Sequence, residues 1–383
     1  MEIISVTIVL YLGLSSLYLF VFALASKLPK VKKVKTVVSN KINSVAVLIP
    51  AYKEDNVIVE VAKKAILQNY PDFSVVIIAD SLKDSTLLTL AKLPVTVIEV
   101  FFEKSTKVKA LNVAFKQLPD YDTALVLDAD NIMDDGFLSA INLEFNKGYS
   151  VIQAQRTAKN LKSNFAILDG LSEAINNNIY NLGCIRLGLS SRLVGSGMFF
   201  NYQLLKNLIE EAKAIGGFDK ELEIKLIKDN IYIHYVHDII LFDEKVNSGA
   251  AFKNQRTRWL AAQFFFLKQY GSTAVMAFLR NGNSDFLNKI IQMALPPRLL
   301  IPVILLLGST LHIFFETHLI FLWLFGLALN LIANLISIPA SMYNKHLLFA
   351  LFSIPKAALM IVLGLFDFKK ANTTFIHTPH NSK

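Results

Sequence analysis

The feature that most constrains this chain is an uncharged apolar stretch near its start. Ile3 to Ser26 comprises 24 residues and contains no charged side chain. About 20 apolar residues are enough to span a bilayer. No basic segment precedes the stretch, and it is longer than the apolar region of a cleaved signal peptide, which has about 7–15 residues. We therefore predict a retained transmembrane helix over residues 1–26.

A basic run follows this stretch and sets the expected orientation. It consists of Lys27, Lys30, Lys32, Lys33 and Lys35. Because cytoplasmic flanks carry the Lys/Arg excess, we expect the N-terminus outside and the chain from Lys27 onward inside. Such a run can also bind nucleic acid. Beside a membrane helix, however, anionic lipid headgroups are the expected partner, and no nucleic-acid partner is expected.

Composition excludes several classes of protein. The chain is 53% hydrophobic and only 18% charged, which is too apolar for disorder and for an ordinary soluble domain with about 25% charged residues. The one cysteine, Cys184, leaves no partner for an intrachain disulfide and excludes a Cys-based zinc site. No HExxH pair occurs, so a zinc hydrolase is not expected.

Residues 27–250 are predicted to form a cytosolic α/β domain. Strand-like apolar runs occur at Val45–Ile49, Val75–Ala79, Val95–Val100 and Ala124–Leu127, and helix-like stretches between them at Asn56–Gln68, Lys107–Lys116 and Asp135–Asn146. This alternation favours a mainly parallel, Rossmann-like sheet with helices on both faces. The glycine-rich dinucleotide fingerprint and the Walker loop are absent, which argues against a dehydrogenase and a P-loop ATPase.

The pattern changes after residue 250. Residues 251–293 are predicted to form interfacial helices, because Trp259–Tyr270 is rich in aromatic residues but carries Lys268. Residues 294–343 are predicted to form two transmembrane helices. Their apolar stretches are Pro296–Phe315 and Thr317–Tyr343, separated by Glu316 alone.

Residues 344–383 leave two alternatives open. By length Leu347–Phe366 suits a further span, but Lys356 lies in its middle, where a lysine costs about 2.5–3.5 kcal/mol on insertion scales. Lys369 and Lys370 follow and favour the cytosol. We therefore favour an interfacial helix with a cytosolic tail.

Polar residues follow the predicted strands at their carboxyl ends, where ligands bind in α/β sheets. Tyr52 and Glu54 follow the first strand, Asp80 the second, and Asp128 and Asp130 the fourth. Two carboxylates at i and i+2 of a strand share a face and can hold Mg²⁺ or Mn²⁺, which would also take diphosphate oxygens. The alternative for Asp-x-Asp is a solvated turn.

Several motifs occur together in one order along the chain. They are Ile49–Glu54, Val75–Asp80, Lys107–Asn112, Leu125–Asp130, Gly195–Met198 and Gln255–Trp259. In this order the sequence resembles the membrane-embedded family 2 glycosyltransferases, which include cellulose, chitin and hyaluronan synthases and ceramide glucosyltransferases. The resemblance covers nearly the whole chain. It implies a GT-A-type nucleotide-sugar domain flanked by transmembrane and interfacial helices.

The resemblance also implies a role for each matching residue. The nucleotide-binding residues would be Ala51, Tyr52, Glu54, Asp80, Lys107, Asp128, Arg258, Thr378 and His380. Asp128 and Asp130 would bind the metal, Mg²⁺ or Mn²⁺. The acceptor-binding residues would be Gly195, Ser196, Gly197, Met198, Gln255 and Trp259. Each also has a plainer interpretation, such as Trp259 as a headgroup anchor and Glu54 as a first-turn acid.

Two motifs depart from the family pattern. The Thr-Glu-Asp that usually carries the catalytic base is Gly217-Phe218-Asp219 here. We assign Asp219 as general base, with Glu221 as the alternative. The tail Phe375–His380 resembles the gating loop of cellulose synthases, with histidine in place of its lysine, so a phosphate contact at His380 would weaken as pH rises through the histidine range. The alternative for this tail is a disordered end.

The resemblance, together with these residues, implies a membrane-bound, inverting hexosyl- or N-acetylhexosaminyltransferase that uses a nucleotide sugar, with UDP favoured. The acceptor would be a growing polysaccharide, or a membrane lipid in a non-processive enzyme. A third alternative is an inactive scaffold that binds nucleotide sugar. Three spans are few for a polymer channel in one chain. This favours the lipid acceptor, or a channel shared with an export partner or within a homo-oligomer. The expected location is a bacterial inner membrane, with the catalytic domain in the cytoplasm.

Overall fold

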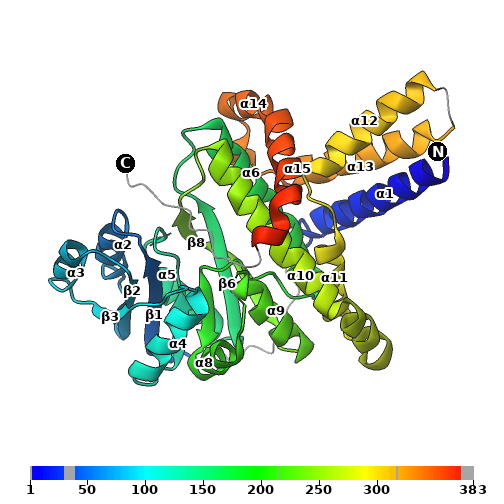
Figure 1. Cartoon of the computed structure of the whole chain (residues 1–383). Helices are drawn as coiled ribbons and strands as arrows, with labels where there is room; N and C mark the ends of the chain where they lie inside the picture. Colours follow the sequence, from blue (N-terminus) through cyan, green and yellow to red (C-terminus); the bar gives the residue numbers. More distant parts are fainter. Residues whose placement is uncertain (1, 30–38, 215, 316–317, 372–383) are drawn as a thin grey trace.

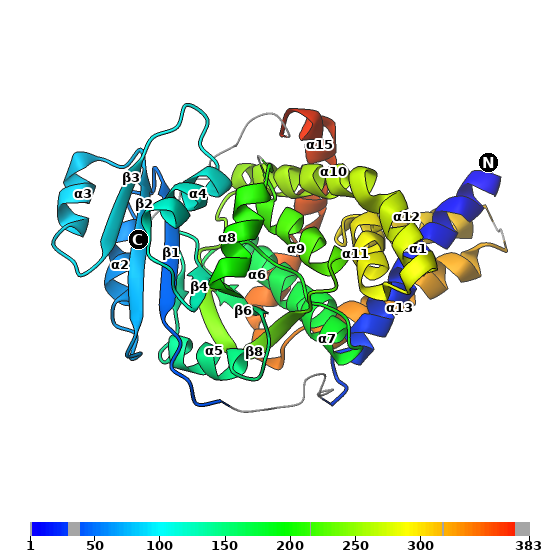
Figure 2. The same cartoon turned by 90° about the horizontal axis from the view of Figure 1, so that it is seen from below.

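The computed structural model describes residues 2–29, 39–214, 216–315 and 318–371. An α/β domain is joined to a group of apolar helices that project away from its sheet (Figure 1). Three of them, α1 (Glu2–Ala25), α12 (Leu300–Phe314) and α13 (Ile320–Ser337), lie side by side. Figure 2 shows that α2 and α3 lie at the opposite end of the molecule from these helices.

The described residues form an eight-stranded sheet in the order β3-β2-β1-β4-β7-β6-β8-β5. Its strands are β1 (Val45–Tyr52), β2 (Phe73–Asp80), β3 (Thr96–Val100), β4 (Thr123–Val126), β5 (Ile132–Met133), β6 (Val151–Ala158), β7 (Met198–Asn201) and β8 (Ile233–Asp243). The first four are parallel to one another, β7 is antiparallel to β4 and β6, β8 is parallel to β6, and β5 is antiparallel to β8. The predicted α/β fold with a mainly parallel sheet is thus confirmed.

Helices cover both faces of the sheet. They are α2 (Ile58–Ala65), α3 (Asp84–Leu90), α4 (Lys107–Gln117), α5 (Phe137–Phe145), α8 (Tyr202–Glu211) and α9 (Phe218–Lys228). Alternate residues of β1 enter two different cores: Leu48 packs with residues of α4, α8 and α9, and Ile49 with residues of α2 and α5. Strands buried on both faces are continuous apolar runs, which explains why the sequence shows them so clearly.

A continuous helical segment joins the sheet to the apolar helices. It consists of α6 (Asn164–Asn176), the π-helical η1 (Asn177–Gly183) and α7 (Cys184–Arg186). This segment contacts α1, α13 and α14. Gly183 approaches α1 so closely that a Cβ there would lie 2.3 Å from the carbonyl oxygen of Phe22. The segment therefore fixes the α/β domain against α1.

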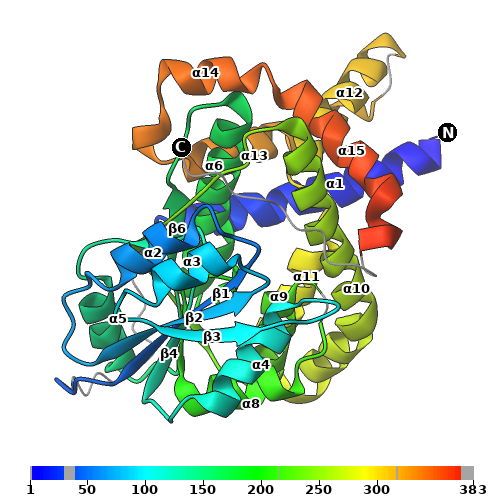
Figure 3. The same cartoon turned by 60° about the vertical axis from the view of Figure 1, so that its left-hand side comes forward.

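The longest helix, α10 (Gly249–Asn281), has 33 residues and extends well beyond the predicted stretch Trp259–Tyr270 at both ends. It begins where the Ser248 hydroxyl accepts a hydrogen bond from the Ala251 N–H, and it ends before Gly282. Figure 3 shows α15 (Ile354–Ala371) beside α10, with α11 (Ser284–Ala294) following α10. A Cβ at Gly364 of α15 would lie 2.5 Å from the Thr257 hydroxyl, so the two helices meet closely there.

Two described helices, Ile3–Ala25 and Ile320–Ser337, are long and apolar enough to cross a membrane. The helix α12 has only 15 residues. After the short η2 (Ala340–Met342), α14 (Lys345–Leu351) and α15 form an apolar pair bent by 49°, which would make a third candidate if the pair is one span. Lys30 to Lys35 and the tail with Thr378 and His380 lie outside the described residues.

The apolar helices bury small and polar side chains between them. The Asn330 amide of α13 donates to the Ser16 hydroxyl of α1 at 3.4 Å, and both side chains are buried. Gly308 of α12 faces the ring of Trp323 in α13. Large apolar side chains such as Phe325 and Leu14 face outward instead. Small residues and interhelical hydrogen bonds inside, with apolar side chains outside, are typical of helices packed within a membrane.

Replacing Gly308 by alanine is expected to destabilise the α12–α13 pair. The new Cβ would lie 2.1 Å from the Trp323 ring, and overpacking of this kind costs about 1–3 kcal/mol. Gly271→Ala in α10 is the matched control, because no described atom lies within 4 Å of its Cβ position. Thermal unfolding in detergent measures both. An unchanged midpoint for Gly308→Ala would contradict this packing.

Candidate active site

A cavity of about 810 Å³ lies at the carboxyl ends of β1 and β2 and at the loop after β4, and it continues between α6, α10 and the apolar helices. Most of the predicted site residues line it. They are Ala51, Tyr52, Glu54, Asp80, Lys107, Asp128, Asp130, Gly195, Asp219, Gln255, Arg258 and Trp259. Residues that are far apart in the sequence therefore share one wall.

The register of β1 and β2 forms one side of the cavity. Tyr52 pairs with Asp80 at the ends of these parallel strands, and the Lys53 N–H donates to the Asp80 carbonyl at 3.1 Å. The Asp80 carboxylate is 3% exposed and accepts a hydrogen bond from the Ser81 hydroxyl at 3.0 Å. Lys53 and Ser81 both have φ of 57°. Left-handed backbone at non-glycine residues is strained and clusters at functional sites.

Lys107 connects three parts of the site. The Thr106 hydroxyl caps α4, so that Lys107 is its first residue. The Lys107 ammonium donates to Asp128 Oδ1 at 2.6 Å and to the Gly195 carbonyl at 2.8 Å. The Asp128 carboxylate is 39% exposed and faces the cavity. The pair therefore holds the loop after β4 against the loop before β7.

Asp130 is more deeply placed than Asp128. It is 5% exposed, and its two oxygens accept from the Asn131 amide and the Glu244 N–H, each at 3.0 Å. No cluster of three or more His, Cys, Asp or Glu side chains that could hold a metal occurs in the part of the chain that the structure describes. Two cavity-lining carboxylates still suit Mg²⁺ or Mn²⁺, which often take one or two protein carboxylates together with substrate phosphates.

The loop Gly195–Met198 lies mostly behind the cavity wall, where it holds Asp128 in place. Gly195 lines the cavity, but Ser196 and Met198 are fully buried and, like Gly197, lie behind its wall. The Ser196 hydroxyl accepts from the Asp128 N–H at 2.9 Å and donates to Asn131. Direct contact between the acceptor and Ser196, Gly197 or Met198 does not fit this placement.

Asp219 lines the cavity at the start of α9. The helix begins after Gly217, which has φ of 69° and whose Cβ position lies only 2.7 Å from Ala262 of α10, so a side chain is excluded there. Burial raises the pKa of the Asp219 carboxyl, and Glu223 adds to that shift, whereas Lys220 and Lys107 oppose it. A carboxylate with a raised pKa in a cavity is suited to accept a proton.

Glu221, the alternative base, has a structural role instead. Its Oε2 accepts from the Ala214 N–H at 2.8 Å and the Lys213 N–H at 3.0 Å, and its Oε1 pairs with Lys225 at 3.4 Å. It is 8% exposed and is not among the residues that line the cavity. The carboxylate therefore holds the loop before α9, and the geometry favours Asp219.

The third side of the cavity comes from α10. Gln255, Arg258 and Trp259 are spaced i, i+3 and i+4, so they lie on one face of the helix, and all three line the cavity. Burial lowers the pKa of the Arg258 guanidinium, and the nearby Asp128 opposes that shift. Arg258 and Lys107 thus lie close to the same carboxylate.

Sequence reasoning missed a charged network behind Asp128. Arg156 Nε lies 2.7 Å from Glu173 and 3.2 Å from Asp243, and the Lys245 ammonium lies 2.5 Å from both carboxylates. Arg156 Nη1 reaches Asp128 at 4.0 Å. Burial, with the charge of Glu173, raises the pKa of Asp243 to about 7. The sequence carried one signal for this network: the strand β8 ends in an acid, Asp243, as β2 ends in Asp80.

The comparison with known proteins places this site in a family. The family described as "Glycosyltransferase like family 2" matches residues 43–262, more than half of the chain. This range contains every described residue of the predicted site. No curated protein sequence matches the chain.

Several solved structures are similar in fold. The mannosyltransferase PcManGT from Pyrobaculum calidifontis, in complex with GDP-Man and Mn²⁺, is 17% identical, with 87% of this chain and 96% of that chain covered and a TM-score of 0.52. The glucosyl-3-phosphoglycerate synthase of Mycobacterium tuberculosis, with Mn²⁺ and UDP, is 16% identical over 53% and 73% of the two chains, with a TM-score of 0.38. Residues 1–349 of TarS from S. aureus are 17% identical over 76% and 89%, also with a TM-score of 0.38. With the matched family covering the whole described site, the chain belongs to the family 2-like glycosyltransferases.

Proposed function

We propose that this protein is a membrane-bound, inverting glycosyltransferase that transfers a hexosyl or N-acetylhexosaminyl group from a UDP-sugar to a glycan or lipid acceptor. One observation carries the proposal. A single cavity joins a strand-end rim for a nucleotide, two cations beside Asp128, a carboxylate with a raised pKa at Asp219, and the exposed ring of Trp259.

The donor would lie along the strand ends. Tyr52, Glu54 and the buried Asp80 would contact the base and ribose, and Lys107 and Arg258 would neutralise the diphosphate. Asp128 and Asp130 would hold the divalent ion, Mg²⁺ or Mn²⁺, which when bound neutralises charge on the departing diphosphate. The mannosyltransferase PcManGT, which is similar in fold, binds Mn²⁺ together with its nucleotide sugar, and this pairing supports the choice of ion.

The transfer needs one displacement. The acceptor hydroxyl oxygen forms a bond to the anomeric carbon from the face opposite the diphosphate, and the bond from that carbon to the diphosphate oxygen breaks. Asp219 takes the hydroxyl proton, and the nucleoside diphosphate leaves. General base catalysis of this kind contributes about 10²–10⁴-fold. Trp259 would orient the acceptor by presenting a flat apolar face.

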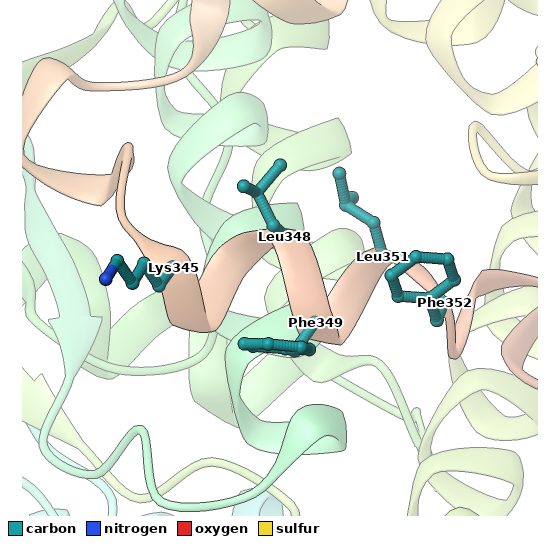
Figure 4. Close-up of a pocket in the computed structure, with 5 residues that line it drawn as sticks. All are labelled: Lys345, Leu348, Phe349, Leu351 and Phe352. Atoms are coloured by element: carbon teal, nitrogen blue, oxygen red, sulfur yellow. The ribbon is translucent and has the colours of Figure 1, made fainter.

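The apolar helices would hold this domain at the cytoplasmic face of a bacterial inner membrane. We propose that α1, α12 and α13 lie in the bilayer and that α14 and α15 lie along its surface. Figure 4 shows the side chains around a surface hollow of about 570 Å³ on α14: Lys345, Leu348, Phe349, Leu351 and Phe352. Three of them are more than 60% exposed, namely Leu348, Phe349 and Phe352, which suits a helix immersed in headgroups.

The position of Lys356 supports the surface placement of α15. Its ammonium lies 5.8 Å from the ring centroid of Phe165 in α6, beside the α/β domain. A lysine at that place avoids the cost of a charge at the centre of a bilayer. The number of spans then stays small for a polymer channel, so a processive enzyme would need a homo-oligomer or an export partner.

Asp219→Asn is expected to lower kcat by about 10²–10⁴-fold, because the amide cannot accept the proton. UDP release by purified protein in nanodiscs measures the rate, and titration with the UDP-sugar measures donor binding, which should persist. Asp229→Asn, an exposed acid at the end of the same helix, is the matched control. Wild-type turnover in the Asp219 variant would overturn its assignment as base.

The rate should also depend on pH in a defined direction. Burial raises the pKa of Asp219, and the base acts only when ionised. The pH dependence of kcat/KM reports the pKa values of the free enzyme. On its acid side, kcat/KM should therefore fall with a midpoint above the ordinary aspartate pKa of about 3.9. The residual rate of Asp219→Asn should lack this fall. A fall at the same pH in both proteins would assign it to another group.

Chelation of the divalent ion should weaken donor binding and abolish activity. We expect EDTA to weaken UDP-sugar binding and Mn²⁺ or Mg²⁺ to restore it, because the diphosphate shares the ion with Asp128 and Asp130. Asp128→Asn should lose the metal dependence. Asp238→Asn, which removes an acid that is 87% exposed on β8, should keep it. Equal donor binding with and without metal would contradict the metal assignment.

A further inference from the structure

Three arginines line the part of the cavity between the α/β domain and the apolar helices. They are Arg192, Arg256 and Arg298, and we call them the arginine row. The donor chemistry proposed above uses none of them. Arg256 stands inside the Gln255–Trp259 motif, at a position where the motif specifies no residue type.

The three side chains of the arginine row contact turns of α6 and η1. Arg256 pairs with Asp169 at 2.5 Å. Arg298 donates to the hydroxyl and carbonyl of Ser172, at 3.2 and 3.3 Å. Asp169 and Ser172 are three residues apart and so adjacent on one helix face. Arg192 lies 4.8 Å from the ring centroid of Tyr180, about two turns further on.

The positive charge of the row is only partly compensated. Asp169 pairs with Arg256, but no described carboxylate forms an ion pair with Arg192 or Arg298. The Nε atoms of both arginines are buried and have no hydrogen-bond partner among the described residues, and the same holds for Oε1 of the neighbouring Gln255. Arg298 also donates to the Asn334 side-chain oxygen, so its partners are neutral groups and not a carboxylate. Placing a cation in a cavity without an opposite charge is costly, and guanidinium forks match phosphate oxygens in pairs. The row therefore fits an anion that enters the cavity.

The cavity beyond the row is mostly apolar. Asn334 of α13, which accepts a hydrogen bond from Arg298, is its polar border there. The apolar lining residues come from α12, α13 and the bent pair α14–α15, and they are Pro302, Leu331, Leu335, Leu351, Ile354 and Ile361. Hydrocarbon fits such walls, whereas a sugar chain would leave its hydroxyls without hydrogen bonds. On the other side, Arg256 lies 4.4 Å from the Trp259 ring centroid, so the row adjoins the proposed acceptor position.

We infer that the acceptor is an anionic amphiphile, whose phosphate group binds the arginine row and whose hydrocarbon chain lies between α12, α13 and the bent pair α14–α15. This inference rests on the proposed function, since it names the acceptor class of the same site. It favours a membrane lipid over a growing polysaccharide. The phosphate anchors the acceptor near Trp259 and Asp219, and the membrane supplies it from the side.

Binding of defined probes to the full chain tests the inference. The protein in uncharged detergent micelles is titrated with phosphatidic acid, with diacylglycerol of the same chains, and with glycerol 3-phosphate, and native mass spectrometry measures the bound fraction. We expect phosphatidic acid to bind at least about tenfold more tightly than either of the others, because only it carries both the anion and the hydrocarbon. The comparison on the wild-type chain does not depend on any variant folding.

Variants then place the site. Arg298→Gln and Arg192→Gln should each weaken phosphatidic acid binding about tenfold, while Arg280→Gln, which removes an exposed arginine near the end of α10, should not change it. UDP-sugar binding by each variant shows whether the fold is intact. Equal loss with Arg280→Gln would mean general charge attraction and would overturn the inference.

The outcomes separate this inference from the proposed function. Donor binding without preference for phosphatidic acid would overturn the acceptor class and leave the glycosyltransferase proposal standing. Equal binding of glycerol 3-phosphate would overturn the hydrocarbon part, because the site would then take a soluble phosphate. Phosphatidic acid binding without any UDP-sugar binding would overturn the donor proposal and, with it, the role of the lipid as acceptor.

Discussion

The contact on which the site depends is the ion pair between Lys107 and Asp128. The Lys107 ammonium binds the Asp128 carboxylate and the Gly195 carbonyl at once. It therefore joins the start of α4, the loop after β4 and the loop before β7. The Lys107 side chain is 18% exposed and the Asp128 side chain 39%, so the pair stays open to water on the Asp128 side and acts mainly by positioning these segments. Asp128 and Gly195, which both line the proposed active site, are thereby held in place relative to each other.

A second constraint joins the catalytic domain to the apolar helices. The segment α6–η1 packs against α1, α13 and α14 on one side and supplies Glu173 to the network around Arg156 on the other. A π-helical turn is uncommon and occurs frequently at functional sites. Here it lies where the cavity passes from charged to apolar walls.

The same segment gives the cavity two chemically different ends. At the strand ends the charges alternate and are largely paired, as with Arg156, Glu173, Asp243 and Lys245. Toward the apolar helices the arginine row outnumbers its one paired acid, Asp169, and the walls beyond it are mostly apolar. A donor that brings its own diphosphate suits the first end. An acceptor with one anionic group and an apolar tail suits the second.

The sequence by itself determined the four parallel strands β1 to β4, the start of α4 and the order of the motifs. Strands buried on both faces, such as Val45–Tyr52, must be continuous apolar runs, and a polar residue at such a strand end, such as Asp80, stands out. These are local signals. They identified the family, the α/β fold and the acids at the sheet edge without any knowledge of distant contacts.

Only the tertiary structure decided which charges meet. The sequence favours Asp219 as the base and leaves Glu221 open as the alternative, and the fold turns Glu221 to the Lys213 and Ala214 N–H groups. Arg156 reaches Asp128 only because β6 and β4 are brought together by β7. Likewise the members of the arginine row come from three separate segments. Electrostatic pairing depends on distance through space, and a sequence records only distance along the chain.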